Sequence, residues 1–290
     1  MAWIGVGVKV FARKQGQRFP LDALGINPAV AYSVRRLRQA YTGPALRVRR
    51  SSDNAEQDIG FAPNGWLDTA QLLSFVGSGS GFVTTWYDQI GTNNAVMITP
   101  SRQPRIVNAG VLELANSKPS VRFIDTSFAF GHNLEFTRFH ALSTPYVAAA
   151  TVYQLNNDGN FPYVFGGMND TGFLSTHLSV FRQYRTSTVR SSLSIINSPS
   201  TVVAPLNSLV CRFTQADRVQ IKDFLNKSNI VSGADHNSDF ASFSTYLIGN
   251  AVAGAIQDTH ISELLFFADT ALTAAQRDAL QDNQMQAFNI

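Results

Sequence analysis

The sequence predicts a mainly β protein, an antiparallel β-sandwich with a few peripheral helices. From Gly81 onward, short runs of β-branched and aromatic residues recur at near-regular spacing, with Gly, Asn, Asp and Ser between them. The chain of 290 residues is long enough to bury one large core. Its 44% hydrophobic residues, 15% charged residues and 21 Phe are typical of a globular protein with an aromatic core. We therefore expect one large domain.

Residues 1–26 are predicted to be an N-terminal arm, and residues 27–290 the domain itself. The arm holds one apolar, strand-like run from Ile4 to Phe11, followed by a basic and polar stretch. It is a candidate attachment segment. The alternative is an extra edge strand of the same sandwich.

A first helix is predicted over residues 28–41. Pro28 suits the first helical position, and apolar residues recur every three or four positions from Ala31 to Tyr41. Gly43-Pro44 would end this helix.

Two further helices have clear signals at their ends. Asp68 is a plausible N-cap for a helix over residues 69–75, with Gly77 as its stop. Near the C-terminus, Thr273 and Gln276 have the spacing of a capping box. We expect a terminal helix there.

Strands account for most of the remaining chain. Arg47-Val48-Arg49 alternates polar and apolar side chains, as a half-buried strand does. Ala148 to Tyr153 has no polar face, so we expect it in the middle of a sheet that is buried on both sides. The expected strands from Gly81 onward cover residues 81–87, 95–98, 105–107, 111–114, 120–124, 146–155, 162–166, 176–182, 191–196, 208–213, 218–224, 244–248 and 259–267.

Three segments carry a family resemblance. Tyr41 to Phe61 and Gly81 to Gly91 resemble the opening of laminin-G-like (concanavalin A-like) jelly-roll domains of bacteriophage virion proteins. They are also similar to the front of the arabinofuranosidase B catalytic domain. Near the C-terminus, Gly254 to Phe267 resembles the last strand of such domains. The resemblance implies a jelly-roll sandwich, but one scaffold hosts many functions.

The resemblance implies a phage virion structural protein, tail-associated or surface-exposed, whose jelly roll binds a glycan or host surface without catalysis. A head decoration protein with a purely architectural role is one alternative, and a glycosidase of arabinofuranosidase B type is the other. The implied partners are other virion proteins, further copies in a homo-oligomer and a host-surface glycan. The implied location is the virion, assembled in a host cytoplasm.

The charge and hydropathy of the sequence argue against nucleic acid as a partner and against membrane insertion. The net charge is only +3, which does not indicate nucleic acid as a partner. No run approaches the roughly 18 apolar residues of a membrane span, so no membrane insertion is expected. Met1 to Val8 lack the charged start of a secretory signal. The single cysteine, Cys211, lies in an apolar run and is expected to be a buried, inert thiol.

A candidate ligand-binding site lies at the end of the strand predicted over residues 81–87. Sugar sites combine an aromatic face with fixed carboxylate or amide groups, and this stretch supplies both. Its residues are Trp86, Tyr87, Asp88, Gln89, Asn93 and Asn94. The alternative is structural, with Trp86 in the core and Asp88 capping its own turn.

Glu263 is the candidate catalytic residue. The resemblance implies that it matches the nucleophile of arabinofuranosidase B. A retaining glycosidase would need a second carboxyl group about 5–5.5 Å away. That family takes its acid/base from further downstream and has an adjacent cysteine pair, which this chain lacks. The resemblance therefore favours a non-catalytic protein in which Glu263 binds neighbouring backbone or Arg groups.

Six arginines within sixteen residues form a candidate anion-binding patch for phosphate or uronate groups: Arg35, Arg36, Arg38, Arg47, Arg49 and Arg50. The alternative is a set of solvated faces with a few structural ion pairs.

No metal or other cofactor is expected, because the sequence has no Asp-x-Asp-x-Asp run and its five His show no zinc spacing. The alternative is a bound calcium ion, for which five aspartates could supply ligands: Asp53, Asp58, Asp88, Asp125 and Asp258.

Overall fold

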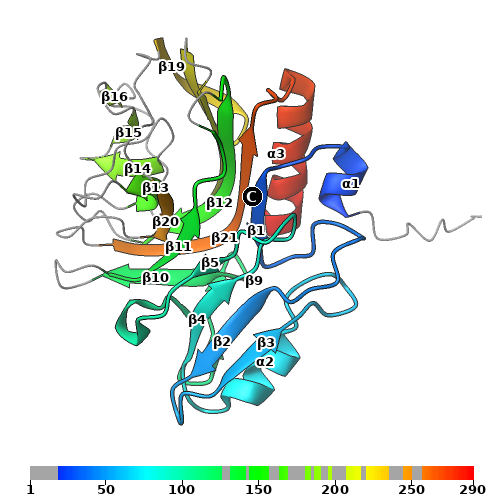
Figure 1. The fold of residues 1–290 in the computed structure, drawn as a ribbon, viewed down its shortest axis with the longest axis vertical. Coiled ribbons are helices and arrows are strands. Elements are labelled where there is room, and N and C mark those ends of the chain that lie inside the picture. Colours follow the sequence, from blue (N-terminus) through cyan, green and yellow to red (C-terminus); the bar gives the residue numbers. More distant parts are fainter. Residues whose placement is uncertain are drawn as a thin grey trace, which may run out of the picture.

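The fold is an antiparallel β-sandwich with two of its described helices on one outer face and a third beside the short strands at one end (Figure 1). The computed structural model describes residues 19–125, 131–141, 144–156, 163–168, 180–183, 186–190, 195–197, 207–216, 220–234, 244–249 and 257–290. The strand predicted from Ile4 to Phe11 lies outside these residues. The predicted mainly β, antiparallel architecture is confirmed.

The first layer is built around two long strands, β12 (Val147–Leu155) and β21 (Gln257–Ala268), which pair along their lengths. Every residue of β12 except Gln154 is buried, so the predicted burial on both faces is confirmed. The layer continues from β12 through β17 (Leu209–Ala216), β18 (Gln220–Leu225) and β19 (Ser228–Ala234). The other edge of β21 pairs with β1 (Val30–Ser33) and β10 (Val121–Asp125).

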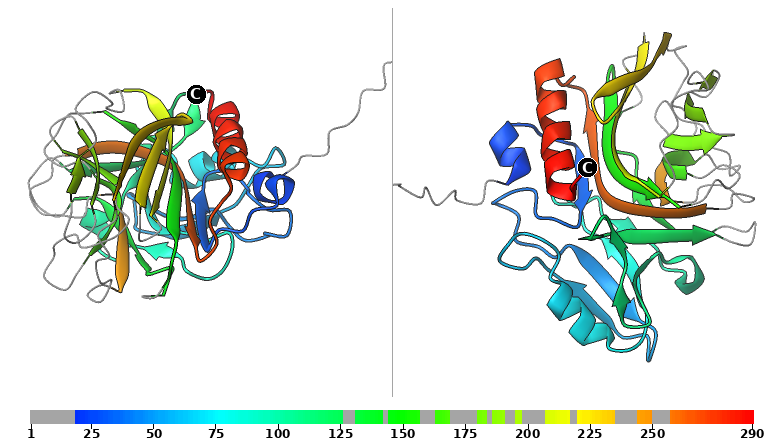
Figure 2. Two further views of the ribbon diagram at one scale, coloured as in Figure 1. Left: turned by 90° about the horizontal axis from the view of Figure 1, so that it is seen from above. Right: turned by 180° about the vertical axis from the view of Figure 1, so that it is seen from behind.

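The second layer lies opposite this curved sheet (Figure 2). Its strands in pairing order are β5 (Ala95–Val96), β11 (Asn133–Thr137), β20 (Thr245–Gly249), β13 (Tyr163–Met168), β14 (Val180–Gln183), β15 (Thr186–Arg190) and β16 (Ile195–Asn197).

One strand joins the two layers. β4 (Gly81–Trp86) pairs with β5 of the second layer and with β6 (Arg105–Asn108), which in turn pairs with β10 of the first. The adjoining short elements are β2 (Leu46–Arg50), β3 (Glu56–Ile59), the 3-10 helix η1 (Pro100–Arg102), β7 (Val111–Leu112), β8 (Leu114–Ala115) and β9 (Lys118–Pro119).

Aromatic side chains fill the space between the layers. The Tyr32 ring lies 6.1 Å from Trp86, 5.3 Å from Phe136 and 6.4 Å from Phe266, measured between ring centroids. Phe165 lies 5.0 Å from Phe266 in the same way. Such edge and tilted contacts add to the large area that each ring buries.

Helices cover the outer face of the first layer. α3 (Ala274–Phe288) packs along β17, and α1 (Pro20–Leu24) lies beside α3 (Figure 1). The predicted capping box is present, with Thr273 and Gln276 each bonded to the other's backbone. Leu21 of α1 and Ile26 are buried with Leu280, so residues predicted as an arm contribute to this core.

The predicted cap of the second helix is also confirmed. Asp68 accepts a hydrogen bond from Gln71 at the start of α2 (Thr69–Val76), and Gly77 follows its last residue. In the described residues no helix is long and apolar enough to cross a membrane.

The helix predicted over residues 28–41 is wrong. Val30–Ser33 instead forms β1, and all four residues are buried because one face meets the sandwich core and the other meets the helices. Pairing with β21 satisfies the backbone along its length. Tertiary pairing therefore outweighs the helical spacing of the apolar residues.

Candidate functional site

The predicted ligand loop lies inside the protein at the junction of the two layers. Trp86 is fully buried and packs against Tyr32. The Tyr87 hydroxyl donates to Asp58 at 2.8 Å, and burial together with this bond raises the pKa of Tyr87 to about 12. The faces of the Trp86 indole are therefore not open to a sugar in this structure.

The carboxylate and amides of the same loop bind the backbone. Asp88 is buried and accepts from the backbone N–H of Ala31 at 2.9 Å and from three N–H groups of its own turn. Gln89 accepts from the Leu37 N–H and donates to the Ser33 and Arg35 carbonyls. These contacts attach the loop to β1.

Both asparagines of the loop are also engaged. Asn94 accepts from the Asp88 N–H at 3.0 Å. Asn93 exchanges two hydrogen bonds with the backbone of Thr137, at 2.8 and 3.0 Å. The geometry supports the structural alternative for this stretch, and ligand binding there stays a prediction.

Glu263 lies at the centre of a buried polar cluster. Its side chain is fully inaccessible, and Arg35 donates to its two oxygens at 2.6 and 2.9 Å. Ser33 donates to it at 2.8 Å and Gln284 of α3 at 3.1 Å. Among the described residues no carboxyl group is hydrogen-bonded to Glu263. A nucleophile must reach the sugar's anomeric carbon. The Glu263 carboxylate is enclosed, and both of its oxygens already accept hydrogen bonds.

The cluster also holds α3 against the sheet. The Cys211 thiol on β17 donates to Gln284 at 3.0 Å, and burial raises the pKa of that thiol to about 12. The predicted burial of this cysteine is confirmed, and its lack of reactivity stays a prediction.

The six arginines have different partners, and anion binding by them stays a prediction. Arg47 and Arg50 pair with Asp58 and Asp53, at 2.8 and 2.7 Å. The remaining four have other partners. Arg35 binds Glu263, Arg36 binds the Arg38 and Gln39 carbonyls, Arg38 binds the Ile26 carbonyl and Asn27, and Arg49 binds Gln103 and Asn54.

The aspartates considered for calcium are similarly engaged where the structure describes their side chains. Asp53, Asp58 and Asp258 pair with arginines, and Asp88 binds backbone N–H groups. Across the described part of the chain, no three His, Cys, Asp or Glu side chains gather as a metal site requires.

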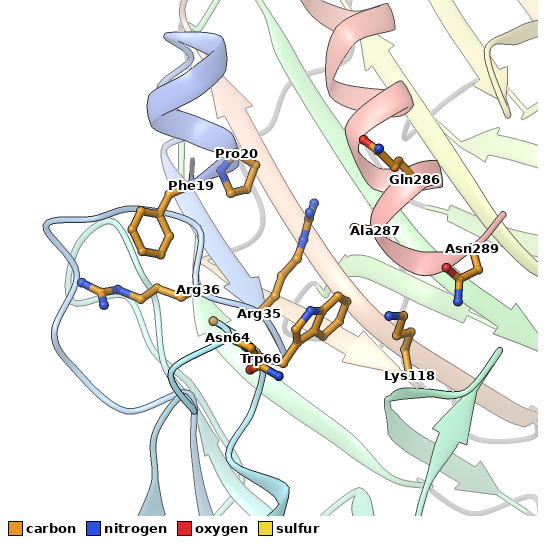
Figure 3. Close-up of a pocket in the computed structure, with 11 residues that line it drawn as sticks. Phe19, Pro20, Arg35, Arg36, Asn64, Trp66, Lys118, Gln286, Ala287 and Asn289 are labelled. Carbon is orange, nitrogen blue, oxygen red and sulfur yellow. Dashed lines mark hydrogen bonds between the residues drawn. The ribbon is translucent and has the colours of Figure 1, made fainter. Parts of the chain in front are cut away.

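A pocket of about 310 Å³ opens where five segments of the chain meet (Figure 3). Phe19 and Pro20 lie at the start of α1, Arg35 and Arg36 follow β1, and Asn64 to Trp66 form a turn. Lys118 lies on β9, and Gln286, Ala287 and Asn289 lie at the end of α3. We call it the Trp66 pocket. Sequence analysis missed it, although the turn signal Pro63-Asn64-Gly65 just before an aromatic residue was available.

His260 on β21 gives a prediction of pH dependence. Burial lowers its pKa to about 4, against the opposing effect of Glu113, and Ser120 lies 2.6 Å from its Nδ1. Arg122 and Arg105 lower this pKa further and Asp258 raises it. The unfolded chain, with an ordinary His pKa of about 6.5, therefore binds the proton first as pH falls.

The free energy of unfolding should consequently fall as the pH is lowered from about 6.5 to about 4. At pH 5 the loss should be about 2 kcal/mol. Urea unfolding at several pH values measures this loss. His260→Gln, which cannot titrate, should show a flatter pH dependence above pH 5. Parallel curves for the two proteins would contradict the assignment.

One family model matches part of the chain. Residues 21–134 match the family model of the alpha-L-arabinofuranosidase B catalytic domain. No curated protein matches the chain. The predicted resemblance to this catalytic domain is therefore confirmed.

Solved structures agree on the fold. A crystal structure of arabinofuranosidase complexed with arabinofuranosyl-alpha-1,2-xylobiose aligns with a TM-score of 0.64 at 16% identity, over 91% of this chain and 63% of that one. A GH54 α-L-arabinofuranosidase soaked with a cyclic sulfate inhibitor aligns with a TM-score of 0.60 at 18% identity, over the same shares. This chain thus spans less than two thirds of the length of these structures.

These findings correct two expectations. The family match and the aligned structures point to arabinofuranosidase, so the expected phage virion structural protein is wrong. The expected virion location, which depended on that resemblance, is wrong for the same reason. The alternative of a glycosidase fits the findings better.

Proposed function

We propose that this protein is a glycosidase of arabinofuranosidase B type that acts on arabinose-containing glycans. The observation that carries the proposal is the family match over residues 21–134. That segment contributes β1 and β10 to the first layer and β5 to the second, together with β4, which joins them. The alignment over 91% of this chain supports the same scaffold beyond the matched segment.

Hydrolysis of a glycoside normally uses two carboxyl groups that flank the scissile bond. In this structure Glu263 is enclosed by Arg35 and Ser33, which argues against this role. Asp223 on β18 is similarly buried and binds Arg212 and Thr214. Burial alone would lower the pKa of Arg212, but Asp223 and Tyr153 raise this pKa above its ordinary value, so Arg212 stays charged.

We therefore place the reacting pair among other carboxylates. Five aspartates follow strands of the sandwich along the sequence and lie outside the described residues: Asp158, Asp170, Asp217, Asp235 and Asp239. They are the first positions to test.

The full chain should release nitrophenol from 4-nitrophenyl α-L-arabinofuranoside and arabinose from arabinofuranosyl-xylobiose. Aspartate to asparagine substitution at two of the five positions should lower turnover at least about 100-fold, because each reacting carboxyl group contributes on that scale. Asp282→Asn, which removes an exposed partner of Lys227, is the matched control and should keep turnover. A folded wild-type protein that releases neither product would overturn the proposal.

A further inference from the structure

The Trp66 pocket has a net positive lining. Its charged side chains are Arg35, Arg36 and Lys118, and no carboxylate is among its lining residues. Glu263 neutralises Arg35. Arg36 binds only backbone carbonyls and lies 4.7 Å from the centroid of Phe19. In the part of the chain that the structure describes, no carboxylate pairs with Arg36 or Lys118.

Lys118 is held beside the ring that a ligand would meet. Its Nζ lies 4.6 Å from the centroid of the half-buried Trp66, and Figure 3 shows the two side chains pointing toward one another. The C-terminal end of α3 carries a partial negative charge, but a helix terminus is worth only about half an elementary charge. Lys118 carries a full positive charge, so the side of the pocket beside Trp66 favours an anion.

The rest of the lining is unlike a simple ion site. Exposed amides of Asn64, Gln286 and Asn289 surround the opening. The side-chain oxygen of Asn64 accepts a hydrogen bond from the backbone N–H of Trp66, and this bond fixes the orientation of the Asn64 side-chain amide. Aromatic rings provide surface for the C–H groups of a sugar, and amides can bind its hydroxyl groups.

We propose that the Trp66 pocket binds a sugar acid, a pyranose that carries one carboxylate. Lys118 binds the carboxylate, the amides bind hydroxyl groups, and Trp66 contacts the ring. The lining has no carboxylate that could act in hydrolysis, so this binding goes beyond the proposed activity and can be tested separately from it.

Titration calorimetry on the full chain should show binding of methyl glucuronoside. Methyl glucoside, which lacks the charge, and inorganic phosphate, which lacks the sugar, should each bind at least about fivefold more weakly, the scale of one partly exposed charged contact. Equal binding of the glucoside, or tighter binding of phosphate, would overturn the proposal.

Two substitutions test the position of the site. Lys118→Gln should weaken the glucuronoside at least about fivefold, and Trp66→Ala, which removes the ring that the sugar contacts, is the second pocket variant. Lys227→Gln removes the same charge from an exposed pair with Asp282 and should leave binding unchanged. Unchanged binding in both folded pocket variants would place the ligand elsewhere. A protein that binds the glucuronoside but hydrolyses no arabinofuranoside would contradict the proposed glycosidase activity and leave this proposal standing.

Discussion

Glu263→Gln is expected to destabilise the fold by about 3–5 kcal/mol, because it leaves Arg35 as a buried charge without its partner. Side-chain exposure is 8% for Arg35 and 0% for Glu263, so water cannot replace the lost carboxylate. Ser33 and Gln284 would each lose a charged acceptor as well. The loss should appear as a lower midpoint of urea unfolding.

Two further variants show whether the charge is the cause. Replacing the pair together, as Arg35→Met with Glu263→Leu, should recover most of the loss, since buried ion pairs can often be exchanged for apolar residues at little cost. Asp282→Asn breaks an exposed pair and should cost less than about 1 kcal/mol. A Glu263→Gln protein with normal stability and no glycosidase turnover would instead give Glu263 the catalytic role.

Local chemistry made the ends of two helices predictable. Asp68 and the Thr273–Gln276 box act on backbone groups a few residues away, so their spacing alone identifies them. The burial of β12 was predictable for a similar reason, since Ala148 to Tyr153 has no polar side to expose. The helix prediction for residues 28–41 failed because the strand that pairs with β1, β21, lies more than 200 residues away in the sequence.

The candidate sites depended still more on distant contacts. An aromatic residue beside carboxylate and amide side chains suits both a sugar site and a buried junction, and only the position of β1 decides between them at Asp88 and Gln89. The Trp66 pocket shows the converse. Phe19, Trp66 and Lys118 come from segments with no common motif, and the fold alone places them together.

Trp86→Ala should cost about 3–5 kcal/mol, because it removes the largest fully buried side chain from the junction of the layers. The substitution would also remove the packing partner of Tyr32. The Tyr32 hydroxyl donates to the carbonyl of Asn93, which lies in the loop that follows Trp86. Thermal or urea unfolding of the variant measures the loss.

Trp86→Phe is the informative companion. The Trp86 indole nitrogen is buried and has no hydrogen-bond acceptor among the described residues. Phenylalanine removes this unsatisfied donor while keeping most of the apolar volume, so it should cost much less than alanine. A loss as large as that of Trp86→Ala would mean that the indole N–H itself stabilises the junction.

Trp66→Ala completes the comparison, because Trp66 is half-buried and lines the pocket rather than the core. It loses an edge contact with Phe288 at 5.3 Å between ring centroids, so its stability cost should be smaller than that of Trp86→Ala. Binding of methyl glucuronoside should show the opposite order, with Trp66→Ala weakened and folded Trp86→Phe unchanged. If Trp86→Phe lost sugar binding while staying folded, the loop at Trp86 would be the recognition site after all.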